Sequence, residues 1–239
     1  MTVRIGTAAW AIPSALRASF PPGDSILARY AQVFDAVEIN SSFYRPHRRT
    51  TYMRWAATVP PGFRFAAKMP KTITHEKRLI GADAETDRFF DEVGGLGGKL
   101  GPLLVQLPPG LVFDARTAGL FFSGLRARTG GALACEPRHP SWFTPDADAL
   151  LRTARVARAA ADPPPVPAAT KPGGWPGLRY ARLHGSPRIY YSDYGPERLA
   201  ELAAGLSAST VETWCIFDNT ALGHATANAL DMRNRLGRP

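Results

Sequence analysis

Charged and amide side chains lie at the carboxyl ends of the strand-like segments of this sequence. In a parallel barrel these ends meet at one mouth, where functional groups gather. Carboxylates beside cations and an imidazole can bind an anion, exchange protons or hold a metal ion. The candidate residues are Glu38, Asn40, Lys68, Gln106, Glu136, Arg138, Asp162, Arg182, His184, Asp218 and Asn219.

Period-two alternation places several candidates on a shared face of their strand. If those faces point into a barrel, the mouth holds four carboxylates against three cations, with one histidine among them. The pairs that share a face are Glu38 with Asn40, Glu136 with Arg138, and Arg182 with His184.

We expect the cations to hold the negative groups of a ligand, and the carboxylates to orient the cations or to act in acid–base chemistry. His184 is the first candidate for proton transfer, because the unperturbed pKa of histidine lies near neutrality. The amides would supply neutral hydrogen bonds. The expected catalytic residues are Glu38, Glu136, His184 and Asp218, the expected anion contacts are Lys68, Arg138 and Arg182, and the expected polar contacts are Asn40, Gln106, Asp162 and Asn219.

Three other chemistries use the same residue types. A metal site needs at least three converging ligands, but the cations at this mouth would repel a metal, so we predict no metal and no other cofactor. A hydrolase or lyase acting on a sugar or phosphate substrate would use Glu38, Glu136 and His184, although neighbouring cations favour ionised carboxylates over the protonated acid that a glycosidase needs. Lys68 would form a Schiff base only if desolvated, and we expect nearby carboxylates to keep it as an ammonium ion.

The formal net charge of +9 is concentrated in one part of the chain. Residues 41–80 contain nine Lys and Arg side chains and a single acid, Glu76, a net +8. Phe43, Tyr44, Tyr52 and Trp55 are interleaved with them, and aromatic rings beside cations can stack on bases or sugars. We expect a positive field beside the mouth, which favours a phosphate-bearing small molecule or a nucleic acid as partner. The alternative is a solvated helix face with its aromatic residues turned into the core.

Strand-like apolar runs alternate with helical patterns along the chain, and this alternation predicts a parallel sheet. Helices are expected at 83–93, 115–128 and 222–236, and Thr144 followed by Pro145 is typical of a helix start. A further segment, 188–194, contains three tyrosines and is expected to form a lid over the mouth. The predicted strands are 3–7, 36–40, 63–68, 103–107, 132–136, 155–161, 178–184 and 211–217.

Eight strand–helix units within 239 residues predict a compact α/β fold of the TIM (β/α)8-barrel type, in a single domain spanning 1–239. One unit departs from the pattern, because residues 163–177 are too rich in Pro and Gly to form a helix. The connection between strands six and seven is therefore expected to be irregular. A doubly wound open sheet is the rival architecture, and the absence of an early glycine fingerprint disfavours it.

Several longer motifs resemble the YecE-like family of bacterial TIM-barrel proteins, a domain of unknown function. The resemblance implies a TIM barrel whose matching polar residues line one mouth, and it adds Tyr44, His75 and Trp142 to the expected ligand contacts. The motifs are GTAAW at 6–10, VEINSSFYR at 37–45, FAAKMPKTITH at 65–75, GPLLVQLPP at 101–109, EPRHPSW at 136–142, RLHG at 182–185 and FDNTALGHATANAL at 217–230.

Composition disfavours several classes of protein. The chain has no apolar run long enough to span a membrane, and its first ten residues lack the apolar core of a signal peptide. Its two cysteines, Cys135 and Cys215, cannot form a disulfide framework. We therefore expect a cytoplasmic protein without membrane partners.

Overall fold

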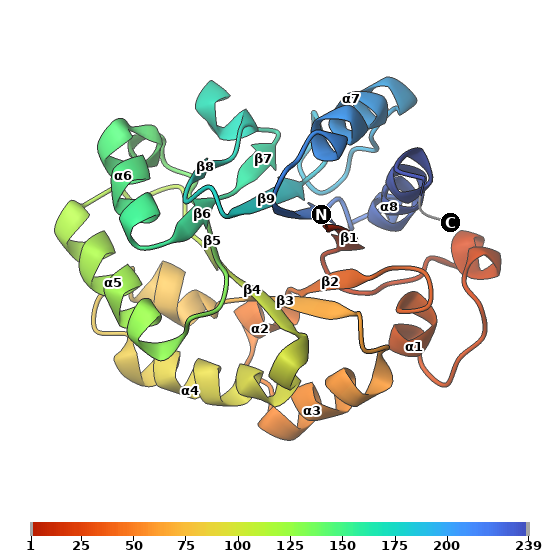
Figure 1. Ribbon diagram of the computed structural model, residues 1–239, viewed down its shortest axis with the longest axis horizontal. Coiled ribbons are helices and arrows are strands. Elements are labelled where there is room, and N and C mark those ends of the chain that lie inside the picture. Colours follow the sequence, from red (N-terminus) through yellow and green to blue (C-terminus); the bar gives the residue numbers. More distant parts are fainter. Residues whose placement is uncertain (1, 238–239) are drawn as a thin grey trace.

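The computed structural model describes residues 2–237, in which strands form the centre and helices surround them (Figure 1). Most strands run parallel, as the alternation of strands and helices predicts. The strands are β1 (Val3–Thr7), β2 (Ala36–Ile39), β3 (Arg64–Lys68), β4 (Leu100–Gln106), β5 (Leu133–Glu136), β6 (Val156–Arg158), β7 (Ala160–Asp162), β8 (Gly173–Gly174), β9 (Leu178–Leu183) and β10 (Glu212–Phe217).

The strands form two hydrogen-bonded sheets, ordered β1-β10-β9-β7 and β2-β3-β4-β5-β6-β8. We call these the first and the second sheet. They meet at two seams: an isolated bridge between Ala8 and Glu38 joins β1 to β2, and the chain passes from β6 to β7 through Ala159. Since β6 pairs with β5 and β7 pairs with β9, the two halves of the sixth strand connect the sheets into a closed ring of eight strand positions.

The helices follow the strands and cover the outside of the ring. Local signals fix several of their ends: Ser25 caps α1 and Thr144 caps α6, and Pro145 occupies the first turn of α6. The helical elements are η1 (Ser14–Ser19), α1 (Ile26–Tyr30), α2 (Ser41–Tyr44), α3 (Arg49–Thr58), η2 (Thr72–Glu76), α4 (Asp83–Val93), η3 (Gly94–Lys99), α5 (Ala115–Arg128), η4 (Pro140–Phe143), α6 (Pro145–Thr153), η5 (Pro167–Thr170), α7 (Pro196–Ser207) and α8 (His224–Arg235).

The connection that follows the sixth strand contains no α-helix, as its Pro and Gly content predicts. It consists of the short turn η5 and the two-residue strand β8, which pairs antiparallel with β6. Without a helix to cover it, the outer surface of β7, β9 and β10 beside α7 is open, and a groove of about 390 Å³ lies there. We call this the lateral groove.

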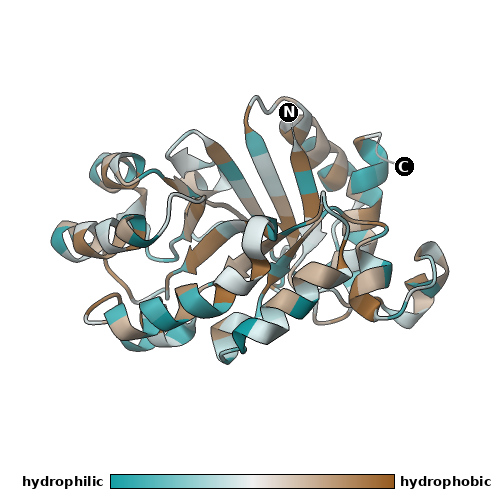
Figure 2. Ribbon diagram, turned by 60° about the horizontal axis from the view of Figure 1, so that its bottom comes forward, coloured by the Kyte–Doolittle hydropathy of each residue, from teal (hydrophilic) through white to brown (hydrophobic). Residues whose placement is uncertain are grey.

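Hydrophobic residues concentrate on the strands and on the sides of the helices that face them (Figure 2). Inside the ring, a smaller cluster contains many alanines, and Tyr180 and Trp214 stack on each other to fill the remaining space. Close packing leaves no room for a side chain at Gly6, whose Cβ would overlap the Ala36 carbonyl group. Among the described residues, no helix is long and apolar enough to cross a membrane.

Candidate functional site

Arg182 of β9 is the hub of a buried ion-pair network at the carboxyl ends of the strands. Its guanidinium group donates hydrogen bonds to three carboxylates: Glu38 at 2.7 and 3.1 Å, Glu136 at 2.7 Å and Asp218 at 2.9 Å. Tyr180, on the same face of β9, donates to Glu38 at 2.8 Å. Alternation along β9 therefore places this face inside the barrel, as predicted.

His184 completes the network by contacting two of the same carboxylates. Its Nδ1 lies 3.0 Å from Asp218 Oδ2, and its Nε2 lies 2.7 Å from Glu136 Oε1. Arg138 also places an amino group 3.0 Å from Nε2. Nε2 can donate to Glu136 only when it carries a proton, and it can accept from Arg138 only when it does not. One proton thus decides which neighbour His184 binds.

The five residues Glu38, Glu136, Arg182, His184 and Asp218 form what we call the inner ring, and each is at most 3% exposed. Burial alone would raise the pKa of Glu136 and of Asp218, but Arg182 and His184 outweigh burial and lower both pKa values. Burial likewise opposes the charge of Arg182, yet the surrounding carboxylates raise its pKa. The inner ring is a charge-paired structure that holds its carboxylates ionised.

Lys68 lies at the end of β3 beside the inner ring but outside its pairing. The side chain is 4% exposed, and its ammonium group lies 4.0 Å from the centre of the Phe43 ring. It forms no ion pair or hydrogen bond with any residue between 2 and 237. Burial, and then repulsion by Arg182, lowers the pKa of Lys68 to about 8. Glu38, Asp218 and Glu136 raise this pKa in turn, as the expectation that carboxylates favour the ammonium ion predicts. None of them forms an ion pair with Lys68, however, because Arg182 and His184 engage them.

Other polar atoms close to Lys68 also lack partners. Within the described chain, Asn40 Oδ1, Gln106 Oε1 and Arg138 Nε are buried and have no hydrogen-bond partner. His75 lies near Lys68, because its ring meets the Phe43 ring edge-on at 4.9 Å and Phe43 covers the Lys68 ammonium group. Burial, and then the charges of Lys68 and Arg138, lower the pKa of His75. We call Asn40, Lys68, His75, Gln106 and Arg138 the outer rim. His75 Nδ1 lies 2.8 Å from Thr74 Oγ1, and Arg138 also pairs with Glu136 at 2.9 Å. Asn40, Gln106 and Arg138 nevertheless each present one buried polar atom that the described chain leaves unused.

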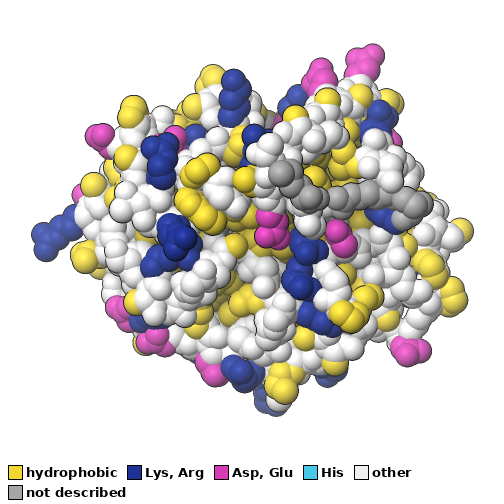
Figure 3. Space-filling view, viewed as in Figure 1, with side chains coloured by type: hydrophobic (Ala, Val, Ile, Leu, Met, Phe, Trp, Pro, Cys, Tyr) yellow, Lys and Arg dark blue, Asp and Glu magenta, His cyan; other side chains and the backbone are white. Residues whose placement is uncertain are grey.

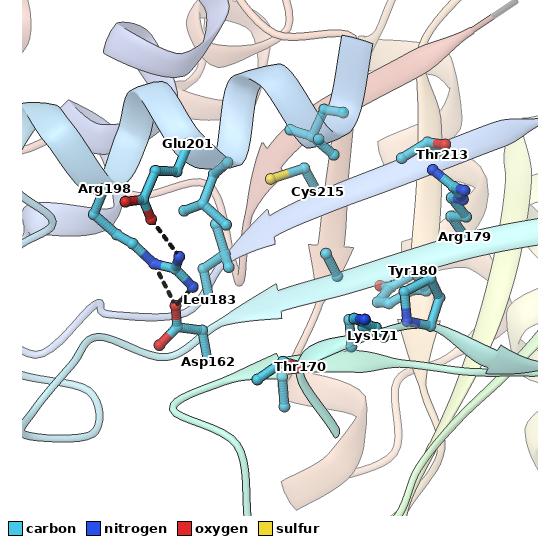
Figure 4. A pocket seen from close by; sticks show the side chains of 17 residues that line it. Asp162, Thr170, Lys171, Arg179, Tyr180, Leu183, Arg198, Glu201, Thr213 and Cys215 are labelled. Carbon is cyan, nitrogen blue, oxygen red and sulfur yellow. Dashed lines mark hydrogen bonds and ion pairs between the residues drawn. The ribbon is translucent and has the colours of Figure 1, made fainter. Parts of the chain in front are cut away.

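Asp162 was expected at the mouth, but its side chain faces the other way. It accepts hydrogen bonds from Arg198 of α7 at 2.7 and 3.0 Å, and Arg198 also binds Glu201. Figure 4 shows these three side chains together in the lateral groove, outside the barrel. The physical reason is alternation: Asp162 shares its strand face with Arg158, which pairs with Asp148 of α6 on the outside.

Three further expected contacts have other surroundings. Trp142 is 1% exposed, donates its indole N–H to the Leu111 carbonyl group and packs against Phe113, so it belongs to the core. Tyr44 is 66% exposed beside Phe43, away from the inner ring. Asn219 is buried, and its amide nitrogen donates to Ser192 and Asn228, whereas its Oδ1 has no hydrogen-bond partner in the described chain.

The tyrosine-rich segment 188–194 is fixed over one side of the mouth. Tyr190 is 41% exposed and its ring meets that of His184 edge-on at 5.8 Å. Tyr194 is buried instead, and its hydroxyl group links the backbone of Gly185 to that of Asp162. Only part of the expected lid therefore lies near the inner ring, and Tyr194 anchors that segment.

The basic segment does not form one uniform cationic surface. Several of its cations pair with acids: Arg49 with Asp91 at 3.3 Å, and Lys77 with Glu85 at 2.8 Å. On the face shown in Figure 3, Lys and Arg side chains are scattered among Asp and Glu. Tyr52 is buried, as the alternative of a solvated helix face with inward aromatic residues predicts.

Tyr180 was not predicted as a site residue, and Phe43 was expected only among the aromatic residues of the basic segment, not as the partner of Lys68. Alternation was sufficient to find Tyr180, because it precedes Arg182 and His184 by two and four positions. Phe43 follows β2 on the short helix α2, and no sequence pattern indicated that its ring would cover Lys68.

These features define an α/β-barrel protein with a buried, charge-paired mouth. The family described as "Protein of unknown function DUF72" matches residues 4–239. The chain belongs to this family, which confirms the YecE-like resemblance.

Two curated relatives resemble part of the chain. The UPF0759 protein YecE of Escherichia coli K12 is 29% identical over 142 residues, which is 59% of this chain and 50% of YecE. The UPF0759 protein YunF of Bacillus subtilis is 25% identical over 151 residues, which is 60% of this chain and 53% of YunF. The chain thus matches about half the length of each of these relatives.

Solved structures match the whole fold. A DUF72 family protein of Enterococcus faecalis has a TM-score of 0.83 at 21% identity, covering 100% of this chain and 96% of the other. One of Thermotoga maritima has a TM-score of 0.80 at 24% identity, covering both chains completely. The 3-keto-D-glucoside 4-epimerase of Escherichia coli has a TM-score of 0.57 at 14% identity, covering 98% and 99%, so its likeness concerns the α/β fold alone.

Proposed function

We propose that the mouth binds a small phosphate-bearing molecule that also carries hydroxyl groups. The observation that carries this proposal is the buried ammonium group of Lys68, with which no carboxylate of the described chain forms an ion pair. A buried cation without a counter-ion is costly, and an anionic ligand would remove that cost. Inside a low-dielectric mouth the same attraction is stronger than on the surface.

The remaining outer-rim atoms suit the other groups of such a molecule. Arg138 Nε is a donor in need of an acceptor, and it complements phosphate oxygens. Asn40 Oδ1 and Gln106 Oε1 are acceptors in need of donors, and hydroxyl groups supply these. With His184 neutral, the inner ring has three carboxylates and one guanidinium group, a net charge of −2, which the charges of Lys68 and Arg138 balance.

A small molecule fits this arrangement better than a nucleic acid. The unpaired polar atoms are buried within the mouth, whereas a polyanion requires an exposed row of cations along its backbone. Arg45 and Arg48 are exposed and would serve a polyanion, but neighbouring basic residues are paired with acids.

The same geometry disfavours a glycosidase. That mechanism requires a protonated carboxyl as general acid, whereas Arg182 and His184 outweigh burial and lower the pKa of Glu136. We therefore assign the inner-ring carboxylates to positioning rather than to acid catalysis.

The test is calorimetric titration with glycerol 3-phosphate, using wild type and Lys68→Met. We expect wild type to bind and Lys68→Met to bind at least about tenfold more weakly, the loss of one charge-assisted contact. Lys71→Met is the matched control, because Lys71 is exposed and pairs with Glu76 at 3.2 Å. Equal binding by wild type and Lys68→Met contradicts the proposal, as does binding only to a single-stranded oligonucleotide.

A further inference from the structure

We infer that Lys68 is a nucleophile that forms an imine with a carbonyl-bearing phosphate ligand at the mouth. This inference rests on the proposed function and adds a reaction to it. Imine formation requires a lysine that is desolvated, free of a carboxylate partner and adjacent to groups that hold the ligand. Lys68 meets the three requirements through different features of the structure.

Desolvation and freedom from pairing follow from the packing. The Lys68 ammonium group lies over the Phe43 ring, and the side chain is 4% exposed. The carboxylates nearby are bound to Arg182 and His184, and none of them forms an ion pair with Lys68. Burial and the Arg182 charge oppose the ammonium form, whereas Glu38, Asp218 and Glu136 favour it, and together they place the pKa of Lys68 at about 8. The neutral amine therefore becomes the main form above about pH 8.

The groups needed to hold a ligand lie on the neighbouring strand ends. Asn40, Gln106 and Arg138 follow or end β2, β4 and β5, and each has an unused polar atom. Lys68 ends β3, which lies between β2 and β4 in the second sheet, so a ligand held by Asn40 and Gln106 would span the end of β3. Positioning of this kind makes an otherwise bimolecular attack effectively intramolecular.

The chemical step needs no other reactant. The Lys68 nitrogen attacks the carbonyl carbon, a carbon–nitrogen bond forms, and the carbonyl oxygen leaves as water with two protons from the ammonium group. The product is a protonated imine on Lys68. If hydride is then supplied, it adds to the imine carbon and fixes the ligand to Lys68 as a secondary amine.

The chain provides its own internal comparison, because it contains only five lysines. Lys71 and Lys77 pair with Glu76 and Glu85 at 3.2 and 2.8 Å. Lys99 donates to the carbonyl groups of Ala56 and Val59. Lys171 is exposed beside the lateral groove. None of these four combines burial with an unpaired ammonium group.

The experiment uses dihydroxyacetone phosphate with cyanoborohydride, followed by peptide mass mapping. We expect an adduct on Lys68 equal to the mass of the probe less one oxygen atom, at least about tenfold more abundant than on any other lysine. Its yield should rise with pH through a midpoint near 8, where Lys68 loses its proton. Glycerol 3-phosphate, which lacks the carbonyl group, should suppress the adduct by competition.

Two variants distinguish a role of Lys68 as a nucleophile from a role of its charge alone. Lys68→Arg keeps the charge and should bind glycerol 3-phosphate but yield no adduct, whereas Lys71→Met should behave like wild type in both measurements. Adduct spread evenly over the exposed lysines overturns the inference. If glycerol 3-phosphate binds and Lys68 remains unmodified, the imine is excluded while the proposed function stands; if neither occurs, both fail.

Discussion

The inner ring and the outer rim contain the same kinds of side chain in opposite electrostatic situations. In the inner ring, Arg182 is buried among three carboxylates that satisfy its guanidinium group. In the outer rim, Lys68 is just as deeply buried and has no carboxylate of the described chain as a partner. The fold can therefore dispense with the Lys68 charge but not with that of Arg182. This difference is the basis of our proposal that the inner ring is structural and that the outer rim contacts a ligand.

Replacing Arg182 should produce the largest effect. Arg182→Met leaves three carboxylates buried without their common partner, which typically costs about 3–5 kcal/mol. Urea unfolding monitored by circular dichroism measures the loss. Arg179→Met is the matched control, because Arg179 lies on the outward face of the same strand beside the lateral groove and should change stability by less than about 1 kcal/mol. Similar losses of stability in Arg182→Met and Arg179→Met would contradict a special structural role for the inner ring.

The second largest effect is expected from acid, which should lower the stability that the inner-ring carboxylates contribute. The folded-state pKa values of Glu136 and Asp218 lie below their ordinary values. Their stabilisation is therefore complete above the unfolded pKa values near 4 and is lost as pH falls through the lower folded values. We expect wild type to lose about 2–4 kcal/mol in this acid range, measured as a shift of the urea midpoint. Glu136→Gln should flatten the profile, whereas the exposed-site variant Glu201→Gln should leave it unchanged.

Removing the Lys68 charge should stabilise the fold, whereas removing the Arg182 charge should destabilise it. The folded pKa of Lys68 is about 8 against an ordinary 10.5, so the unfolded state binds the proton more tightly. Wild type is therefore penalised at pH 7, and Lys68→Met should be more stable by about 1–3 kcal/mol. The gain should disappear above about pH 10.5. A thermal unfolding series between pH 7 and 11 measures it, and a loss of stability at pH 7 would contradict the comparison.

Changes in the exposed basic segment should have the smallest effect. Arg45→Ala and Arg48→Ala alter side chains that are exposed to solvent, so stability should change by less than about 0.5 kcal/mol. Affinity for glycerol 3-phosphate should change less than about twofold. A tenfold loss in the calorimetric titration would extend the ligand-binding surface beyond the outer rim.

The strand ends and their inward faces could be predicted because alternation has a fixed period. Glu38, Glu136, Arg182 and Asp218 are therefore found where the sequence places them. Asp162 was misplaced because a position at a strand end was taken as sufficient, although Arg158 on the same face already indicated the outside of the barrel. Alternation gives the direction of a side chain but not its partner.

Which cation pairs with which carboxylate at the mouth could not be predicted from the sequence. A list of three cations and three carboxylates permits many pairings, and the geometry of one guanidinium group selects among them. Arg182 can engage three acids at once because its planar fork presents five N–H donors. Lys68 is left unpaired as a consequence, and that outcome depends on distances across the barrel.

The division of the barrel into two sheets gives the inner ring a mechanical consequence. Arg182, on the first sheet, donates hydrogen bonds to Glu38 and Glu136, which both belong to the second sheet. Glu38 lies at one seam, and Glu136 ends the strand that pairs with β6 at the other. These ion pairs thus connect the first and the second sheet near the seams, where few backbone hydrogen bonds join them. A ligand that displaced Arg182 from these carboxylates would therefore alter the contacts between the sheets at both seams.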